Sequence, residues 1–164
     1  MSLSGARSSR TGTDNLTVIV DTGSDLTWVQ CKPCSVCYAQ RDPQFDLSGS
    51  ASYTVVPCNA SACEASLKAA TGVPGRGVLA TDTVALGGAS VDGFVFGCGL
   101  SNRGLFGGTA GLMGLGRTEL SLVSQTEPRF GDVFSYCLPA ATSGDAVGSL
   151  SLSGNMSSYR NATP

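Results

Sequence analysis

The chain has 164 residues, a formal net charge of −2 at pH 7 and no histidine. A chain of this length is sufficient for one domain with its own hydrophobic core. The absence of histidine excludes Ser-His-Asp and Cys-His catalysis and imidazole metal ligands, so acid–base chemistry falls to carboxylates. The basic residues are scattered rather than clustered, so nucleic acid is not an expected partner.

The composition favours a β-rich fold. Hydrophobic residues make up 41% of the chain and charged residues 13%, and there are 22 glycines. This balance is typical of sheets joined by tight turns rather than of long helices with charged surfaces. We therefore predict an all-β or β-dominated globule.

Cysteines and sequons indicate a secretory origin. There are seven cysteines, a density typical of disulfide-bonded proteins from oxidising compartments. Four N-x-S/T sequons make Asn15, Asn59, Asn155 and Asn161 candidates for glycosylation. No apolar run reaches the roughly 20 residues needed to cross a bilayer, and residues 1–15 lack the apolar core of a signal peptide. We expect no membrane partner, and we interpret the missing signal as a truncated or restarted reading frame.

The elements predicted from the first half of the chain begin after a polar tail, residues 1–14, that we expect to be disordered. Residues 16–20 form an apolar run typical of a fully buried strand, which ends abruptly in Asp21-Thr22-Gly23-Ser24. A second strand is expected at 26–30. A cysteine-rich insertion follows at 31–63, and residues 64–70 favour one or two helical turns.

The second half of the chain contains further strand patterns. Residues 78–86 and 91–96 predict a hairpin across Gly87-Gly88. Thr118 is a candidate N-cap for a short helix over 119–125, and residues 133–138 predict one more strand. The remainder, 140–164, is rich in small and polar residues and is typical of a linker, so the predicted domain covers residues 15–139.

The Asp-Thr-Gly-Ser sequence has a chemical rationale as an active-site loop. Asp21 requires a rigid, partly buried position, and Gly23 lets another backbone approach its carboxylate. Ser24 can hydrogen-bond the outer carboxylate oxygen, while Thr22 can reach across an interface to lock two loops together. Asp-Thr-Gly on its own is also common in ordinary turns, so the flanking residues decide between the two interpretations.

Those flanking residues carry a family resemblance. Residues 18–31, Val-Ile-Val-Asp-Thr-Gly-Ser-Asp-Leu-Thr-Trp-Val-Gln-Cys, resemble the first active-site motif of pepsin-like aspartic peptidases. Segments similar to the plant nepenthesin-type branch follow in the family's order at 31–37, 45–46, 50–53, 58–63, 96–99, 111–117 and 134–138. The combination is specific and covers most of residues 16–138.

The resemblance implies one lobe of a bilobal fold, built from antiparallel sheets or a distorted barrel with one or two short helices. Each lobe contributes one aspartate, and the pair activates the water that attacks the peptide bond. Asp21 matches the first aspartate, and Trp28 matches the tryptophan that supports the flap tyrosine. Leu112, Met113 and Gly114 match the element threaded through the aspartate loop. We also expect these supporting residues to pack in the core.

Two departures from the family pattern limit what the resemblance implies. The family's flap, with Tyr-Gly-Asp-Gly-Ser, should lie between Cys63 and Gly77, where residues 64–76 contain no tyrosine. We interpret the family's second lobe, with its own Asp-Ser-Gly or Asp-Thr-Gly, as missing after Pro164, and no other D-[ST]-G sequence occurs in the chain. We therefore expect the isolated chain to be inactive.

The cysteines and two further motifs leave alternatives to consider. Cys31, Cys34, Cys37, Cys58, Cys63, Cys98 and Cys137 are the disulfide candidates, and their odd number leaves at least one thiol unpaired or bridged to another molecule. The spacing of the first three resembles a ferredoxin-like cluster, but its fourth position is Arg41, so we expect no metal. Residues 111–118 miss the lysine and the preceding strand of a phosphate-binding loop. We expect Asp25 and Asp82 to be solvated or turn-bonding carboxylates.

Three functions remain open. The chain is an aspartic endopeptidase lobe that needs a second lobe or a homodimer, a non-catalytic lobe that binds peptide or protein as an inhibitor does, or a truncated product without its own activity. The resemblance implies a peptide or protein substrate, no cofactor, and a secretory, extracellular or vacuolar location.

Overall fold

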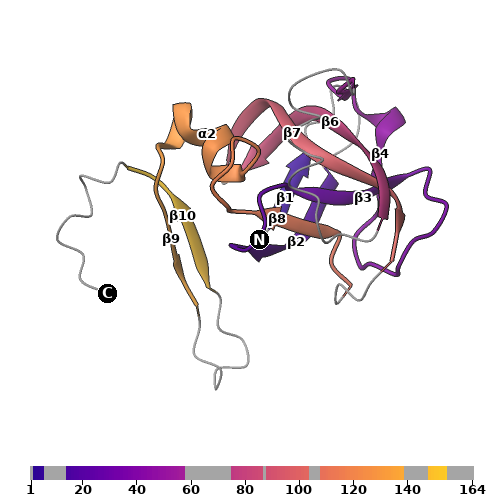
Figure 1. The fold of residues 1–164 in the computed structure, drawn as a ribbon, viewed down its shortest axis with the longest axis horizontal. Helices are drawn as coiled ribbons and strands as arrows, with labels where there is room; N and C mark the ends of the chain where they lie inside the picture. The colour runs from indigo at the N-terminus through magenta and orange to yellow at the C-terminus, as the bar shows by residue number, and fades with distance from the viewer. Residues whose placement is uncertain are drawn as a thin grey trace.

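The computed structural model describes residues 2–5, 14–57, 75–86, 88–103, 108–138 and 148–154 (Figure 1). The predicted helical turn at 64–70 lies outside these residues. The described elements are β1 (Ser2–Gly5), β2 (Asp14–Asp21), β3 (Trp28–Lys32), β4 (Phe45–Asp46), the 3-10 helix η1 (Leu47–Gly49), β5 (Thr54–Val55), β6 (Gly75–Leu86), β7 (Ala89–Asn102), β8 (Gly111–Gly114), α2 (Leu122–Phe130), β9 (Phe134–Cys137) and β10 (Ser149–Leu152).

The main sheet closes on itself, which confirms the predicted barrel. Its strands run in the order β1-β2-β8-β3-β7-β6-β5, and β1 also pairs with β6, so the path from β1 to β6 forms a ring. Most neighbours are antiparallel, but β2–β8, β3–β7 and β3–β4 are parallel. The sheet is therefore mixed rather than antiparallel throughout, as had been expected. The sequence does not reveal strand direction, because side chains alternate with a period of two in parallel and antiparallel strands alike.

Strand β2 alternates between the core and the surface. Leu16 and Val18 are each 4% exposed, whereas Ile19 and Val20 are 38% and 39% exposed. The prediction of a fully buried strand over 16–20 is therefore wrong for Thr17, Ile19 and Val20, which are exposed. A continuous run of apolar residues does not show whether the outer face of the strand is covered by protein or exposed to water.

The longest predicted pairing is confirmed and extended. Strands β6 and β7 form a hairpin from Gly75↔Asn102 to Leu86↔Ala89. Gly88 has φ +86°, a conformation that glycine adopts without strain, at the turn. The hairpin brings Leu79, Phe94 and Phe96 into the core beside the barrel's other strands.

Helix α2 begins later than the sequence predicted. Its N-cap is Ser121, whose hydroxyl accepts a hydrogen bond from the Ser124 amide at 3.2 Å. Residues 119–121 precede the helix, and Thr118 instead donates its amide to Asp25. Two good N-cap residues lie three positions apart here, so residue preference alone could not choose between them.

Both segments expected to lack structure contain a strand. In the segment expected to be a tail, β1 pairs with β2 and β6, and in the expected linker β10 pairs with β9 to form a separate ribbon beyond α2 (Figure 1). Leu150 and Leu152 of β10 pack against the core. None of the helices in the described ranges has the length and apolar character that a membrane crossing requires.

Candidate active site

Asp21 ends strand β2 at a position fixed by backbone pairing. Its register partner is Gly114 of the parallel strand β8, and its carbonyl accepts a hydrogen bond from the Leu115 amide at 2.9 Å. The side chain is half-buried, and Oδ1 accepts the Gly23 amide at 2.9 Å. A backbone donor aimed at a carboxylate holds its orientation and stabilises its charge. Asp21 is therefore presented as a fixed, accessible carboxylate.

Strand β8 passes between the two strands that flank the Asp21 loop. It pairs in parallel with β2 and antiparallel with β3, where Trp28 lies opposite Leu112. The turn after β8 then holds the loop itself. The Gly116 amide donates to the Ser24 carbonyl at 2.9 Å, and the Thr118 amide donates to Asp25 Oδ1 at 3.0 Å.

This threading requires residues without side chains. A Cβ at Gly114 would overlap the carbonyl group of Asp25, and one at Gly111 would overlap the carbonyl oxygen of Trp28. The neighbouring atoms belong to the backbone and cannot rotate away. Glycine at positions 111 and 114 therefore permits the close approach of two backbone segments. The sequence had suggested such a role for Gly23, where a Cβ would lie 3.3 Å from Asp21 Oδ1.

The predicted supporting residues surround the loop, but not all act as expected. Trp28 is 5% exposed and Met113 fully buried, so their expected core packing is confirmed, while Leu112 is half-buried. Thr22 is exposed. The expected hydrogen bond from Ser24 to Asp21 is not formed, because the Ser24 hydroxyl is buried without a hydrogen-bond partner among the described residues.

The two other aspartates considered from the sequence lie in different environments. Asp25 bonds the turn after β8, as expected of a turn-bonding carboxylate. Asp82 is 3% exposed, so the expectation of a solvated group is wrong. It accepts hydrogen bonds from the Ser50 hydroxyl at 3.0 Å and the Thr83 amide at 2.7 Å, inside the barrel.

Four of the cysteine candidates form disulfides. Cys31 joins Cys98 across β3 and β7, and Cys34 joins Cys37. Bonded sulfurs are not thiolates, so the spacing of Cys31, Cys34 and Cys37 has no cluster-binding role here. Cys137 is an exposed free thiol, while Cys58 and Cys63 lie outside the described residues. Among those residues no group of three metal-binding side chains is found.

A buried amide that the sequence did not single out anchors the cysteine-rich loop. Gln30 of β3 is fully buried. Its Nε2 donates to the Tyr38 carbonyl at 3.0 Å and to Gln40 Oε1 at 2.6 Å, and its Oε1 accepts from the Tyr38 amide and Asn102. The sequence could have indicated this role, because a glutamine among apolar strand residues is buried only when its amide is hydrogen-bonded.

The glycosylation candidates are only partly described. Asn15 is an exposed residue of β2 that faces Ser4 of β1 in the register. Asn59, Asn155 and Asn161 lie outside the described residues.

A closed mixed barrel that holds an Asp-Thr-Gly loop beside a threaded strand defines one lobe of the pepsin-like type. Residues 7–76 and 70–154 match the family model described as xylanase inhibitor N-terminal, and the chain belongs to this family. The crystal structure of edgp matches with a TM-score of 0.56 at 23% identity, over 94% of this chain and 42% of that chain.

The chain is also similar in sequence to plant aspartic proteases. An aspartyl protease family protein of Arabidopsis thaliana is 45% identical over 151 residues, covering 79% of this chain and 32% of the relative. Aspartyl protease AED1 of the same plant is 44% identical over 142 residues, covering 79% and 31%. Aspartic proteinase nepenthesin-1 of Nepenthes gracilis is 39% identical over 135 residues, covering 73% and 30%.

These matches confirm the nepenthesin-type resemblance, and the chain spans about a third of the length of these relatives.

Proposed function

We propose that the chain is the amino-terminal lobe of an aspartic-type endopeptidase and that Asp21 is one of its two catalytic carboxylates. The observation that carries this proposal is the position of Asp21 at the end of β2, where it pairs in register with Gly114 and its Oδ1 accepts a hydrogen bond from the Gly23 amide. The aspartic protease relatives support the same assignment.

The chemistry needs a second carboxylate. Two close carboxylates cannot both ionise cheaply, so one stays protonated as the acid while the other serves as the base that activates water. The water attacks the peptide carbonyl, and no covalent intermediate forms. The Gly23 amide holds Oδ1 of Asp21 in a fixed orientation for this chemistry.

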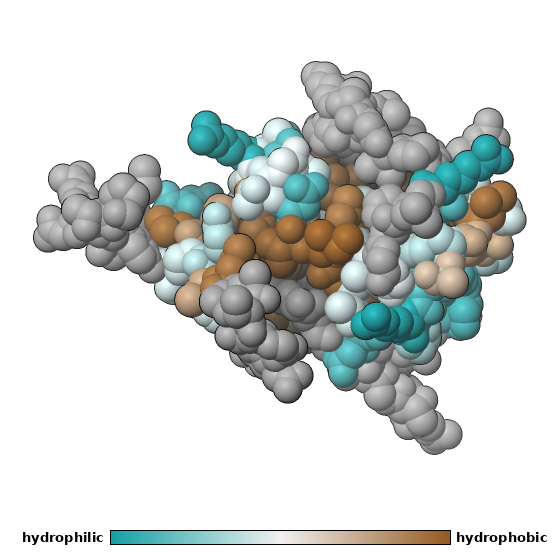
Figure 2. Space-filling model, turned by 90° about the horizontal axis from the view of Figure 1, so that it is seen from below, coloured by the Kyte–Doolittle hydropathy of each residue, from teal (hydrophilic) through white to brown (hydrophobic). Residues whose placement is uncertain are grey.

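The second carboxylate comes from a second lobe or from a second copy of this chain. Ile19 and Val20 lead into the Asp21 loop, and each residue is more than a third exposed. Figure 2 shows a continuous hydrophobic patch on the face seen from beneath the barrel. Apolar patches of this kind mark contact surfaces, which supports a protein partner on the face that Figure 2 shows.

A missing flap would leave the site open above Asp21. The alignment with the Arabidopsis relative at 45% identity runs over 151 positions but includes only 79% of the 164 residues of this chain. The number of aligned positions is therefore larger than the number of residues that this chain contributes. Some positions of that relative therefore have no counterpart here. The two family matches also meet at residues 70–76, inside the segment where the flap was expected.

A second candidate is a lobe that binds protein or peptide without cleaving it. The family name, xylanase inhibitor N-terminal, favours this alternative. A truncated product without activity is the third outcome. For all three, the two disulfides among the described residues favour folding in an oxidising compartment, in keeping with a secretory, extracellular or vacuolar location.

The test is a peptide-cleavage assay at acid pH with the isolated chain over a wide concentration range. The proposal predicts no cleavage by a verified monomer, because one carboxylate cannot serve as both acid and base. Cleavage that rises with the square of concentration, and is lost in Asp21→Asn, would identify a homodimer. Cleavage proportional to concentration in a monomer, or surviving Asp21→Asn, would overturn the assignment. Saturable binding of a peptide without cleavage, unchanged in Asp21→Asn, would favour the non-catalytic alternative.

A further inference from the structure

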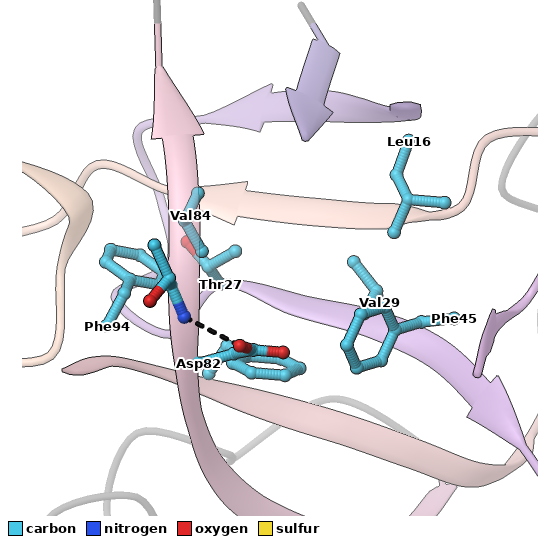
Figure 3. A pocket seen from close by; sticks show the side chains of 9 residues that line it. Leu16, Thr27, Val29, Phe45, Asp82, Val84 and Phe94 are labelled. Carbon is cyan, nitrogen blue, oxygen red and sulfur yellow. Dashed lines mark hydrogen bonds between the residues drawn. The ribbon is translucent and has the colours of Figure 1, made fainter. Parts of the chain in front are cut away.

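The barrel interior contains a small cavity with two polar groups among apolar walls. Its volume is about 40 Å³, and Phe45, Phe94 and Phe96 form part of its lining. Figure 3 shows Thr27, from the segment before β3, and Asp82, from β6, on the walls of this cavity.

Asp82 presents a carboxylate that is only half satisfied. Its Oδ1 accepts hydrogen bonds from the hydroxyls of Ser50 and Ser52 and from the Thr83 amide. Its Oδ2 is buried and has no partner among the described residues. All three donors to Oδ1 are neutral groups, so none of them forms an ion pair with the Asp82 carboxylate. Burying such an oxygen without a donor is costly.

Thr27 presents a second unpartnered group in the same cavity. The residue is 1% exposed, and its Oγ1 is buried without a hydrogen-bond partner in the described part of the chain. Its backbone is fixed, because its carbonyl accepts the Gly97 amide at 2.8 Å. The side chain therefore cannot leave the cavity without breaking the contact between β7 and the segment before β3.

The size of the cavity selects the class of ligand. A water molecule needs about 10–15 Å³ of space and two to four polar partners, and this cavity provides the space and two partners. Organic ligands need about 300 Å³ or more. The described residues include no group of three metal-binding side chains, so a metal ion is not accommodated.

We propose that the cavity is a binding site for buried water, with a water molecule donating a hydrogen bond to Asp82 Oδ2 and bonding the Thr27 hydroxyl. This water joins β6 to the segment that connects the Asp21 loop to β3. The site is independent of the proposed catalytic role, because it depends on the barrel interior alone.

The test compares Thr27→Val with Thr27→Ser. Valine has the shape of threonine without the hydroxyl, so the sign of the effect separates two states of the cavity. If the cavity is dry, Thr27→Val removes a buried unsatisfied group and raises the urea midpoint. If water is bound, the variant removes one of its partners, and we expect the unfolding constant to rise several-fold. Thr27→Ser keeps the hydroxyl and should keep the water.

Water itself is counted by oxygen-17 magnetic relaxation dispersion, which detects long-lived buried molecules. We expect a smaller dispersion amplitude in Thr27→Val than in the unmodified chain, and an unchanged one in Thr27→Ser. Val84→Ile provides a second route because it fills the cavity; it should also lower the amplitude and the urea midpoint. Val18→Ile, at a buried valine outside the cavity lining, controls for the added methyl group.

An unchanged amplitude in both Thr27→Val and Val84→Ile, or a raised urea midpoint in either, would overturn the proposal. Where Thr27→Val does not fold, Val84→Ile decides the question by the same two readouts.

Discussion

Asp21 and Gly114 are register partners in the parallel pair of β2 and β8, so the position of the carboxylate depends on a glycine distant in sequence. A Cβ at Gly114 would overlap the backbone of Asp25. We predict that Gly114→Ala lowers the free energy of unfolding by about 3 kcal/mol, because backbone atoms must move to make room. Urea unfolding followed by the fluorescence of Trp28, the single tryptophan, measures this.

Gly93→Ala is the control for that variant. No atom lies within 4 Å of a Cβ there, but φ is +66°, so the expected cost is only about 1 kcal/mol from backbone strain. Equal costs for the two variants would show that the approach of β8 to the Asp21 loop is not tight.

Replacing Gln30 should weaken the cysteine-rich loop. Gln30→Leu keeps a buried side chain of similar size but removes the bonds to Tyr38, Gln40 and Asn102. We expect the free energy of unfolding to fall by about 2–4 kcal/mol, since several buried polar groups lose their partner. Gln44→Leu, at a half-buried position beside β4, should change it by less than about 1 kcal/mol. A Gln30→Leu variant as stable as the unmodified chain would contradict the network's role.

Tyr38 should make the fold sensitive to alkaline pH. Burial raises the pKa of Tyr38 from 10.0 to about 12. The unfolded chain therefore loses this proton at lower pH than the folded chain, so the contribution to stability is complete below pH 10 and is lost as the pH rises towards 12. We expect the urea midpoint of the thiol-blocked chain to fall over this window.

Tyr38→Phe is the control, because it removes the titrating hydroxyl and should show a smaller fall between pH 10 and 12. Identical pH profiles for the variant and the unmodified chain would exclude Tyr38 as the cause.

Cys137 should react with alkylating reagents in the native, unreduced chain. It is exposed and free, while Cys31, Cys98, Cys34 and Cys37 are bonded. Peptide mapping after labelling should place a label on Cys137, and Cys137→Ser should lose that label. A monomer in which Cys137 stays unlabelled without denaturant would show that the thiol is covered or modified.

The sequence was sufficient for the elements whose pattern is strong and local. The β6–β7 hairpin has alternating apolar residues around a Gly-Gly turn, and the Asp21 loop follows an apolar strand. Strand β1 was missed because Ser-Leu-Ser-Gly has no pattern of its own and is held by its pairing with β2 and β6. Strand β10 does alternate, as Ser149-Leu150-Ser151-Leu152, but the surrounding small residues concealed it.

Other features depend on tertiary contacts that no local pattern encodes. Ile19 and Val20 are neighbours in β2, so their side chains lie on opposite faces of the strand. Both are exposed although Val18 is buried, and an apolar run does not reveal where along a strand burial ends. Asp82 is bonded in the interior by Ser50, the C-cap residue of η1, and by Ser52 in the loop that follows, 32 and 30 positions away in the sequence. For the same reason, the unpartnered hydroxyl of Ser24 could not be anticipated from the motif.

The most direct test of the central claim is reconstitution of the two-carboxylate site. The chain would be mixed with a separately produced carboxyl-terminal lobe of the Arabidopsis relative at 45% identity, and peptide cleavage would be measured at acid pH. We predict cleavage by the mixture, absence of cleavage by either lobe alone, and a loss of about 10³-fold or more with Asp21→Asn. Cleavage by the mixture that is unchanged in Asp21→Asn, or absence of cleavage in a complex verified to form, would contradict the assignment of Asp21 as a catalytic carboxylate.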